Sequence, residues 1–289
     1  MCDELTDADN ERVFGKVSRR EFAGMTGAAA LAAMLPAPAD AKPLKQRDIT
    51  IRTPDGTAQA YFVAPDRGKH PAVLVWPDIA GLRPSFRKMA ERLAQSGYAV
   101  LTVNQFYRSA PLPVVKDGES WGQPEVRAKL MEWRKLLTPE AVMRDASAFA
   151  TFLDKQPEVN TRRGMGTTGY CMGGPMVMQT AARLPGRIRA GASFHGGGLA
   201  TDKPDSPHLL VPRMKASFLF AVAENDDQRN PNEKELLRKA FADAGLPAEI
   251  EVYAGAMHGW CPPDSPAYNQ TQAEKAWGRL LALFGKALA

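Results

Sequence analysis

The chain has 289 residues, of which 44% are hydrophobic and 24% are charged, with a formal net charge of +5. These ordinary globular fractions exclude a disordered chain, a collagen-like repeat and a coiled coil, and no stretch approaches the roughly 20 apolar residues of a membrane span. The mild basic excess contains no long Lys/Arg run, so we expect no nucleic-acid partner. Three cysteines are too few for a disulfide scaffold. A cysteine that matters here should therefore matter for its chemistry.

The first 41 residues have the three parts of an export signal. Arg19 and Arg20 form an arginine pair, an alanine-rich apolar stretch follows over 23–35, and small residues spaced for cleavage end at Ala39 and at Ala41. A basic region, a short apolar core and a small-residue site are typical of a secretory leader, and the arginine pair indicates the twin-arginine route. The alternative is a harmless arginine pair in front of an amphipathic helix.

This interpretation divides the chain into a twin-arginine signal peptide over 1–41 and one domain over 42–289. We expect the twin-arginine translocase as a partner during export, and a location in the periplasm or outside the cell. Whether cleavage follows Ala39 or Ala41 stays open, as does the oligomeric state, for which we expect a monomer.

The body of the chain alternates strands and helices. A hairpin is predicted around Pro54-Asp55-Gly56, because this turn signal separates two short runs of strand-forming residues. The predicted strands cover 47–53, 58–64, 72–76, 98–103, 164–169, 188–194, 217–223 and 249–253. The predicted helices cover 85–95, 139–153, 175–183, 232–244 and 267–288. Buried strands that alternate with helices predict an α/β fold with one mostly parallel sheet of about eight strands and helices on both faces.

The longest irregular segment covers 110–138 and carries Trp121 and Trp133. It is either a surface excursion with a short helix or a wall or lid over an active site.

A glycine-rich turn is the first candidate for chemistry. Gly169-Tyr170-Cys171-Met172-Gly173-Gly174 follows a predicted strand and opens a predicted helix. Small residues on both sides of the cysteine permit the sharp strand-to-helix turn of the α/β-hydrolase nucleophile elbow, here with Cys171 in place of serine. The helix N-terminus favours a thiolate, and the backbone N–H of Met172 can face a developing oxyanion. The alternative is a buried structural cysteine.

The acid and the base are expected after two later strands. Asp226 and Asp227 lie just after the strand over 217–223, and His258 follows the last predicted strand. The order nucleophile, acid, base is that of α/β-hydrolases. Asp226 is preferred over Asp227, with a solvated turn as the alternative for both, and His195 rivals His258 as the base because it also follows a strand.

Together, the elbow around Cys171, the acid Asp226 and the run His258-Gly259-Trp260 resemble the dienelactone hydrolase family, the carboxymethylenebutenolidases. The resemblance covers about residues 45–288. It implies an α/β-hydrolase fold and a Cys-His-Asp catalytic triad that acts on esters or lactones.

The resemblance implies further site positions, and the match there is uneven. Asp78 stands where the family has a glutamate that pairs with the resting thiol, and the N–H of Ile79 would be the second oxyanion donor. Arg108 matches an arginine that binds the substrate carboxylate. The second such arginine of the family is replaced by Pro262, which weakens the case for the dienelactone substrate itself.

We therefore expect a hydrolase of activated esters or lactones that works through a thioester, with a small-molecule substrate, no cofactor and no metal. One alternative is an exported binding protein on a hydrolase fold with weak catalysis. Another is a thiol redox or metal-binding protein that uses Cys171, His258 and Cys261, and a regulatory Cys171–Cys261 disulfide is a related hypothesis.

Overall fold

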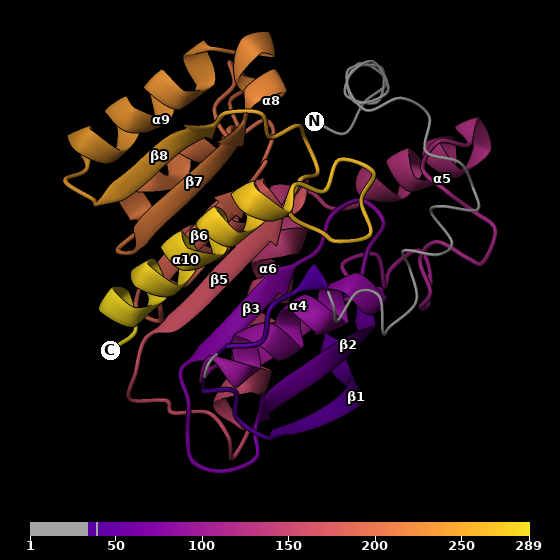
Figure 1. Ribbon diagram of the computed structural model, residues 1–289. Coiled ribbons are helices and arrows are strands. Elements are labelled where there is room, and N and C mark those ends of the chain that lie inside the picture. The colour runs from indigo at the N-terminus through magenta and orange to yellow at the C-terminus, as the bar shows by residue number, and fades with distance from the viewer. Residues whose placement is uncertain (1–33, 39) are drawn as a thin grey trace.

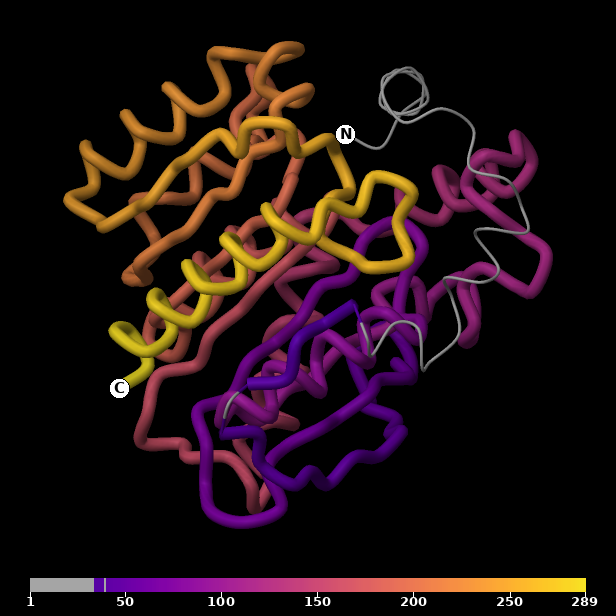
Figure 2. Tube along the Cα trace, in the orientation of Figure 1, coloured from indigo at the N-terminus to yellow at the C-terminus, as the bar shows by residue number. Residues whose placement is uncertain are grey.

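The computed structural model describes residues 34–38 and 40–289 of the chain (Figures 1 and 2). Most of the predicted export signal lies outside these residues and stays a prediction. Within them, eight strands form one sheet in the order β1-β2-β4-β3-β5-β6-β7-β8. Only β1–β2 and β2–β4 pair antiparallel, and the other pairs are parallel. The predicted mostly parallel sheet of about eight strands is confirmed.

The predicted elements are found within a few residues of their expected ends. The strands are β1 Leu44–Thr53, β2 Gly56–Pro65, β3 Ala72–Trp76, β4 Ala99–Val103, β5 Met165–Tyr170, β6 Ile188–Phe194, β7 Ser217–Ala223 and β8 Ala248–Tyr253. The helices are α4 Pro84–Gln95, α5 Pro124–Arg134, α6 Pro139–Asp154, α7 Gly173–Arg183, α8 Glu224–Arg229, α9 Asn232–Asp243 and α10 Gln270–Ala287, with a 3-10 helix η1 over Pro207–Arg213. The short elements α8 and η1 were not predicted, because neither is long enough to show a helical period.

Helices cover both faces of the sheet, as Figure 1 shows. On one face α4 and α10 insert apolar side chains, among them Phe86, Leu280 and Phe284. On the other face α5, α6, α7 and α9 do the same, for example with Phe149 and Phe241. Because both faces are covered, the central strands β3, β4 and β5 are buried along their whole length.

The insertion over 110–138 is packed against the domain rather than looped away from it. Helix α5 buries Val126 and Leu130 in the core, and the ring of Trp133 lies 6.2 Å from that of Phe106, just after β4. A Cβ on Gly81 would meet Val114 of the insertion at 2.7 Å. The insertion therefore forms a wall beside the loop that follows β3.

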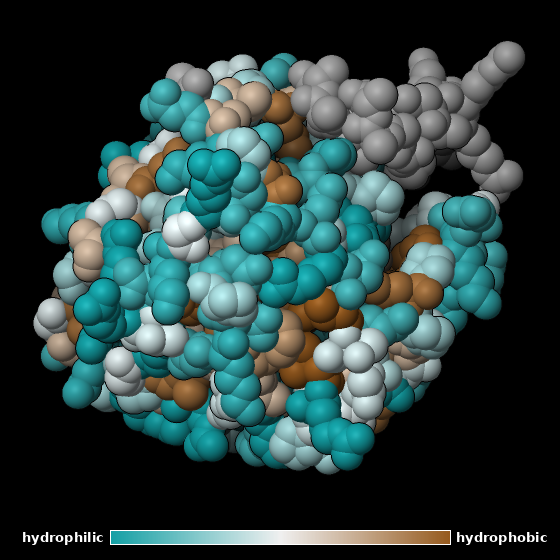
Figure 3. Space-filling view, turned by 90° about the horizontal axis from the view of Figure 1, so that it is seen from below, coloured by the Kyte–Doolittle hydropathy of each residue, from teal (hydrophilic) through white to brown (hydrophobic). Residues whose placement is uncertain are grey.

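No helix among the described residues is long and apolar enough to cross a membrane. In the view of Figure 3, hydrophilic residues cover most of the surface, and hydrophobic residues form only small separate groups.

Candidate active site

Cys171 lies at a strained turn between β5 and α7. Its φ is 53°, in the left-handed region that a residue with a side chain rarely adopts. Such a conformation costs about 1 kcal/mol or more and is found where the surrounding structure enforces it, often in active sites. Two backbone hydrogen bonds hold the turn, one from the Cys171 N–H to Phe194 O at 3.1 Å and one from the Gly174 N–H to Cys171 O at 3.0 Å. This is the geometry expected of a nucleophile elbow.

Two glycines make this turn sterically possible. A Cβ on Gly169 would lie 2.2 Å from the carbonyl oxygen of Gly173, and a Cβ on Gly173 would lie 2.3 Å from the carbonyl oxygen of Trp76. No side chain fits at such separations, because the nearest atoms belong to backbone rather than to flexible side chains. The strand, the helix and the end of β3 therefore approach one another only because both positions are glycine.

The topology brings the other predicted groups to the same edge of the sheet. Strands β5, β6, β7 and β8 are neighbours and parallel, so their carboxyl ends meet. Cys171 and His195 directly follow β5 and β6, while Asp226 and His258 follow β7 and β8. The residues that the sequence analysis singled out from four separate segments thus come together along one edge.

His258 is bound to Asp226. The two side chains are buried, and His258 Nδ1 lies 2.7 Å from Asp226 Oδ2. The neighbouring Asn225 fixes the backbone as well, because its Oδ1 accepts from the His258 N–H at 2.8 Å. Three residues before His258 in the same loop, the Gly255 N–H donates to Glu224 Oε2 at 2.6 Å. The first turn of α8 therefore holds both the ring and the backbone of the segment that carries the histidine.

Asp227 has a different partner. Both of its carboxylate oxygens accept hydrogen bonds from Lys234 Nζ, at 2.6 and 2.7 Å. Adjacent residues of a helix point in different directions, so α8 directs Asp226 and Asp227 to different partners. The sequence had left open which of the two is the acid. The structure thus places Asp226, not Asp227, against His258.

His195, the rival candidate for the base, lies beside His258 without a carboxylate partner. Its ring is 5.0 Å from that of His258 and 5.2 Å from that of Trp260, in edge-to-face arrangements. Burial and then the nearby His258 hold its pKa well below the ordinary value, so the ring is neutral. Among the described residues, neither of its ring nitrogens has a hydrogen-bond partner.

Two backbone N–H groups are candidates for an oxyanion hole. Met172 precedes the first residue of α7, where backbone N–H groups have no acceptor within the helix. Ile79 is buried in the loop after β3. The two residues that follow it are bonded to Asp78, because the Ala80 N–H donates to Asp78 Oδ1 and the Gly81 N–H donates to Asp78 O. Both candidates lie at the edge of the sheet that carries Cys171.

Asp78, the candidate thiol-switch residue, is engaged by an arginine that the sequence analysis did not identify. Arg83 Nη1 donates to Asp78 Oδ1 at 2.6 Å and Arg83 Nη2 to Asp78 Oδ2 at 3.0 Å. A movement of Asp78 toward the thiol would have to break both bonds. The switch therefore finds no support in these contacts.

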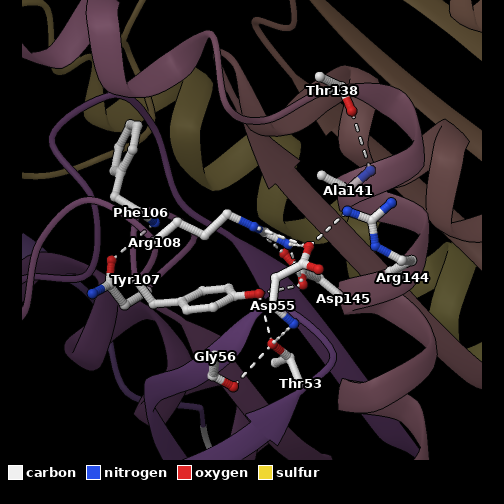
Figure 4. A network of polar contacts seen from close by, with 11 residues as sticks. Thr53, Asp55, Gly56, Phe106, Tyr107, Arg108, Thr138, Ala141, Arg144 and Asp145 are labelled. Carbon is white, nitrogen blue, oxygen red and sulfur yellow. Dashed lines mark hydrogen bonds and ion pairs between the residues drawn. The ribbon is translucent and has the colours of Figure 1, made fainter.

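Arg108, the candidate for binding a substrate carboxylate, is bonded to two carboxylates of the protein (Figure 4). Its two terminal nitrogens donate to Asp145 at 2.8 Å each, and Nε and Nη2 donate to Asp55 at 3.2 and 2.6 Å. Tyr107 and Arg144 complete the cluster by donating to Asp145 and Asp55. Four of its five N–H groups thus bond to carboxylates of the protein, so these contacts by themselves give no support for a role of Arg108 in binding a substrate carboxylate.

Cys261 is a free, buried cysteine, so a disulfide with Cys171 is not formed. Burial raises the pKa of the Cys261 thiol well above its ordinary value, which makes it a poor nucleophile. Within the described part of the chain, no group of three or more His, Cys, Asp or Glu side chains is arranged to hold a metal ion.

Sequence reasoning missed Asn225, Arg83 and Asp264. Asn225 could have been noticed as a polar neighbour of the candidate acid at the end of β7. Arg83 and Asp264 carry no such signal, because they lie 181 positions apart and only the fold brings them together.

Comparisons with known proteins show the family to which the chain belongs. The model of the dienelactone hydrolase family matches residues 58–288. The chain is 26% identical over 245 residues to a Methylorubrum extorquens protein named "Putative carboxymethylenebutenolidase", which covers 83% of this chain and 81% of that one. It is also 26% identical over 238 residues to a Bradyrhizobium protein named as a lactonase, at 81% and 91% coverage.

The fold is similar to solved structures. The crystal structure of a "Putative Dienelactone Hydrolase" from Klebsiella pneumoniae superposes with a TM-score of 0.73 at 23% identity, over 85% of this chain and all of that one. At that identity the similarity concerns the α/β-hydrolase fold alone. The family itself rests on the match over residues 58–288, nearly all of the described domain. The chain therefore belongs to the dienelactone hydrolase family.

Proposed function

We propose that this protein hydrolyses activated esters or lactones with Cys171 as the nucleophile, His258 as the proton carrier and Asp226 as the group that orients it. One observation carries the proposal. Cys171 is held with a φ of 53° at the β5–α7 turn, while the buried His258–Asp226 pair, 2.7 Å apart, follows the strands at the same edge. The names of the relatives, a carboxymethylenebutenolidase and a lactonase, support an ester or lactone as substrate.

In the first half of the reaction, the proton of Cys171 resides on His258 and the thiolate attacks the carbonyl carbon. The carbonyl oxygen becomes an oxyanion, which the N–H groups of Met172 and Ile79 stabilise. The intermediate collapses to a thioester, and the departing alkoxide takes the proton from His258. A lactone opens in the same step, and its alcohol stays attached to the acyl group.

In the second half, a water molecule gives a proton to His258 and its oxygen attacks the thioester carbon. Collapse of this intermediate expels the Cys171 thiolate and releases the acid, which restores the thiolate and the protonated histidine. Because a thiolate is itself a good leaving group, the first intermediate goes forward only when the alcohol leaves easily. The mechanism therefore favours activated esters, enol esters and lactones over amides.

The decisive experiment compares Cys171→Ala with the matched control Cys261→Ala in the full chain. We expect Cys171→Ala to lower kcat/KM for p-nitrophenyl acetate and for an enol-lactone by at least about 1000-fold, because the covalent route is lost. Cys261→Ala should stay within about twofold of the wild type, since that thiol is buried and protonated. Thermal unfolding should show that both variants fold.

Mass spectrometry of the enzyme quenched during turnover should find the acyl group on Cys171. Wild-type activity in Cys171→Ala would overturn the proposed mechanism. The alternative, a binding protein with weak catalysis, predicts instead that the wild type itself shows no turnover of either substrate.

A further inference from the structure

Arg83 joins two loops of the candidate site through five hydrogen bonds. Toward one loop its Nη1 and Nη2 donate to Asp78, as described above, and Nη1 also donates to Gly81 O at 3.2 Å. Toward the other, Nε donates to Asp264 Oδ2 at 2.7 Å and Nη2 to Asp264 Oδ1 at 2.9 Å. The guanidinium lies 4.9 Å from the centre of the Phe86 ring. All three nitrogens are thus used, and two carboxylates are held at once.

The first of these loops carries the candidate oxyanion donor. Ile79 directly follows Asp78, and the Asp78 carboxylate also accepts the N–H of Ala80 at 2.9 Å. Gln105, in the turn after β4, supports the same loop, because its Nε2 donates to Asp78 O at 2.8 Å. The position of the Ile79 N–H therefore depends on where Asp78 is held, and Arg83 holds its side chain.

The second loop, which connects β8 to α10, carries the candidate base His258. Asp264 lies six residues after His258 and is itself buried. Between them, Trp260 is fully buried and its carbonyl oxygen accepts from the Asn269 N–H at 3.1 Å. The loop that Arg83 binds is thus anchored to the body of the domain, and it provides a fixed point for the loop after β3.

Charge keeps this link intact. Burial alone would lower the pKa of Arg83, but the carboxylates of Asp264 and Asp78 more than offset it and raise the pKa above its ordinary value. Arginine stays protonated in proteins and its planar fork suits two carboxylates, whereas the single ammonium of lysine does not.

We propose that Arg83 is a positioning residue that fixes the Ile79 N–H relative to the catalytic centre. The proposal rests on the proposed function, since it concerns the oxyanion of that reaction. An oxyanion donor acts only within about 2.7–3.1 Å of the developing charge, and a displacement of 1 Å can cost about 100-fold in rate. The loop after β3 is irregular backbone, so an ion pair to a second loop adds an effective constraint on it.

The test compares Arg83→Met with Arg92→Met in the full chain. Arg92 is a close match: it lies on α4, donates two hydrogen bonds to one carboxylate, that of Glu274, at 2.6 and 2.7 Å, and stacks on Trp277. Among the described residues, its side-chain hydrogen bonds and ring contact involve none of the candidate site residues. Arg83→Met should lower kcat/KM for p-nitrophenyl acetate about 10- to 100-fold, mainly through kcat. Arg92→Met should stay within about twofold, although both variants lose a largely buried ion pair.

A second measurement separates positioning of the oxyanion donor from general loss of structure. Iodoacetamide alkylates a thiolate by displacement at a saturated carbon and forms no oxyanion. In protein that has first been reduced with dithiothreitol, the rate of Cys171 alkylation, followed by mass spectrometry of its peptide, should therefore stay within about twofold of the wild type in Arg83→Met. If ester hydrolysis and Cys171 alkylation fall in parallel, or if Arg83→Met hydrolyses the ester as fast as Arg92→Met, the proposal is wrong.

Two milder variants keep the test valid if Arg83→Met does not fold. Arg83→Lys keeps the positive charge but loses the planar guanidinium fork, and Asp264→Asn keeps a hydrogen-bond acceptor but loses the negative charge. Each variant should therefore lower kcat by a smaller factor, about 3- to 10-fold, and leave the alkylation rate of Cys171 unchanged. Wild-type kcat in both would also overturn the proposal. Failure of the proposed function is seen separately, because it leaves Cys171→Ala active.

Discussion

Asp226 and Asp145 are two buried aspartates with partners of different chemistry. Asp226 bonds to His258 at 2.7 Å, and Asp145 bonds to Arg108 twice at 2.8 Å. A histidine can gain or lose a proton near neutral pH, whereas an arginine keeps its charge. The first pair can therefore take part in proton transfer, and the second can only hold the structure. Although both aspartates are buried and ion-paired, we expect replacement of Asp226 to affect turnover and disruption of the Asp145 pair to affect stability.

The first way to test this contrast is Asp226→Asn, for which we expect the largest effect. The amide keeps the size of the side chain but removes the charge that stabilises a protonated His258, so kcat for p-nitrophenyl acetate should fall about 100- to 10,000-fold. The control is Asp227→Asn, which loses the charge that pairs with Lys234 of α9. Steady-state kinetics of the two variants checks this. Equal losses in both would mean that Asp226 has no special role.

Arg108→Met should give the opposite pattern. It leaves the Asp145 carboxylate buried without its cation, which costs about 3 kcal/mol of the free energy of unfolding, or roughly 6–12 °C in Tm for a domain of this size. The kcat/KM of the folded fraction should stay within about twofold of the wild type, for neutral and anionic esters alike. A selective rise in KM for esters that carry a carboxylate would return Arg108 to the substrate site.

The stability loss in Arg108→Met should also depend on pH. Burial raises the pKa of Asp145, and the hydrogen bonds from Arg108 oppose this rise. Without Arg108 the folded-state pKa lies farther above the unfolded value of about 3.9. The folded variant then binds a proton at Asp145 more tightly than the unfolded chain does. This proton binding stabilises the variant fully below the unfolded pKa of Asp145, and the stabilisation is lost as the pH rises through the folded-state pKa. The difference in Tm between wild type and variant should shrink from pH 8 to pH 5.

Asp55→Asn should have the smallest effect. Hydrogen bonds from Arg144, and to a smaller extent from Arg108, lower the pKa of Asp55. The ionised Asp55 therefore contributes stability above its unfolded-state pKa, and this contribution is lost as the pH falls through its folded-state pKa. Because solvent screens this carboxylate, the loss in Tm should be smaller than in Arg108→Met, and 1 M NaCl should diminish it. A loss as large as that of Arg108→Met would show that Asp55, not Asp145, is the main partner of Arg108.

Much of the fold was predictable because local patterns carry it. The buried strands are short apolar runs in the sequence. Thr138 directly precedes Pro139, which is a typical start of a helix, and its side chain accepts from the Ala141 N–H at 3.3 Å in the first turn of α6. The elbow was predictable for the same reason, since glycines on both sides of Cys171 are typical of a sharp strand-to-helix turn. The short helix α8 was not predictable, although it is what directs Asp226 and Asp227 apart.

The sequence by itself determined the order of strands and helices, the turn at Cys171 and the candidates for acid and base, because these depend on neighbours within a few residues. Only the tertiary structure decided which aspartate meets His258, that Arg108 is occupied by Asp145 and Asp55, and that Arg83 links Asp78 to Asp264. These contacts join residues up to 181 positions apart. A charged side chain takes whichever opposite charge the fold brings within reach, and a linear pattern of charges does not contain that information.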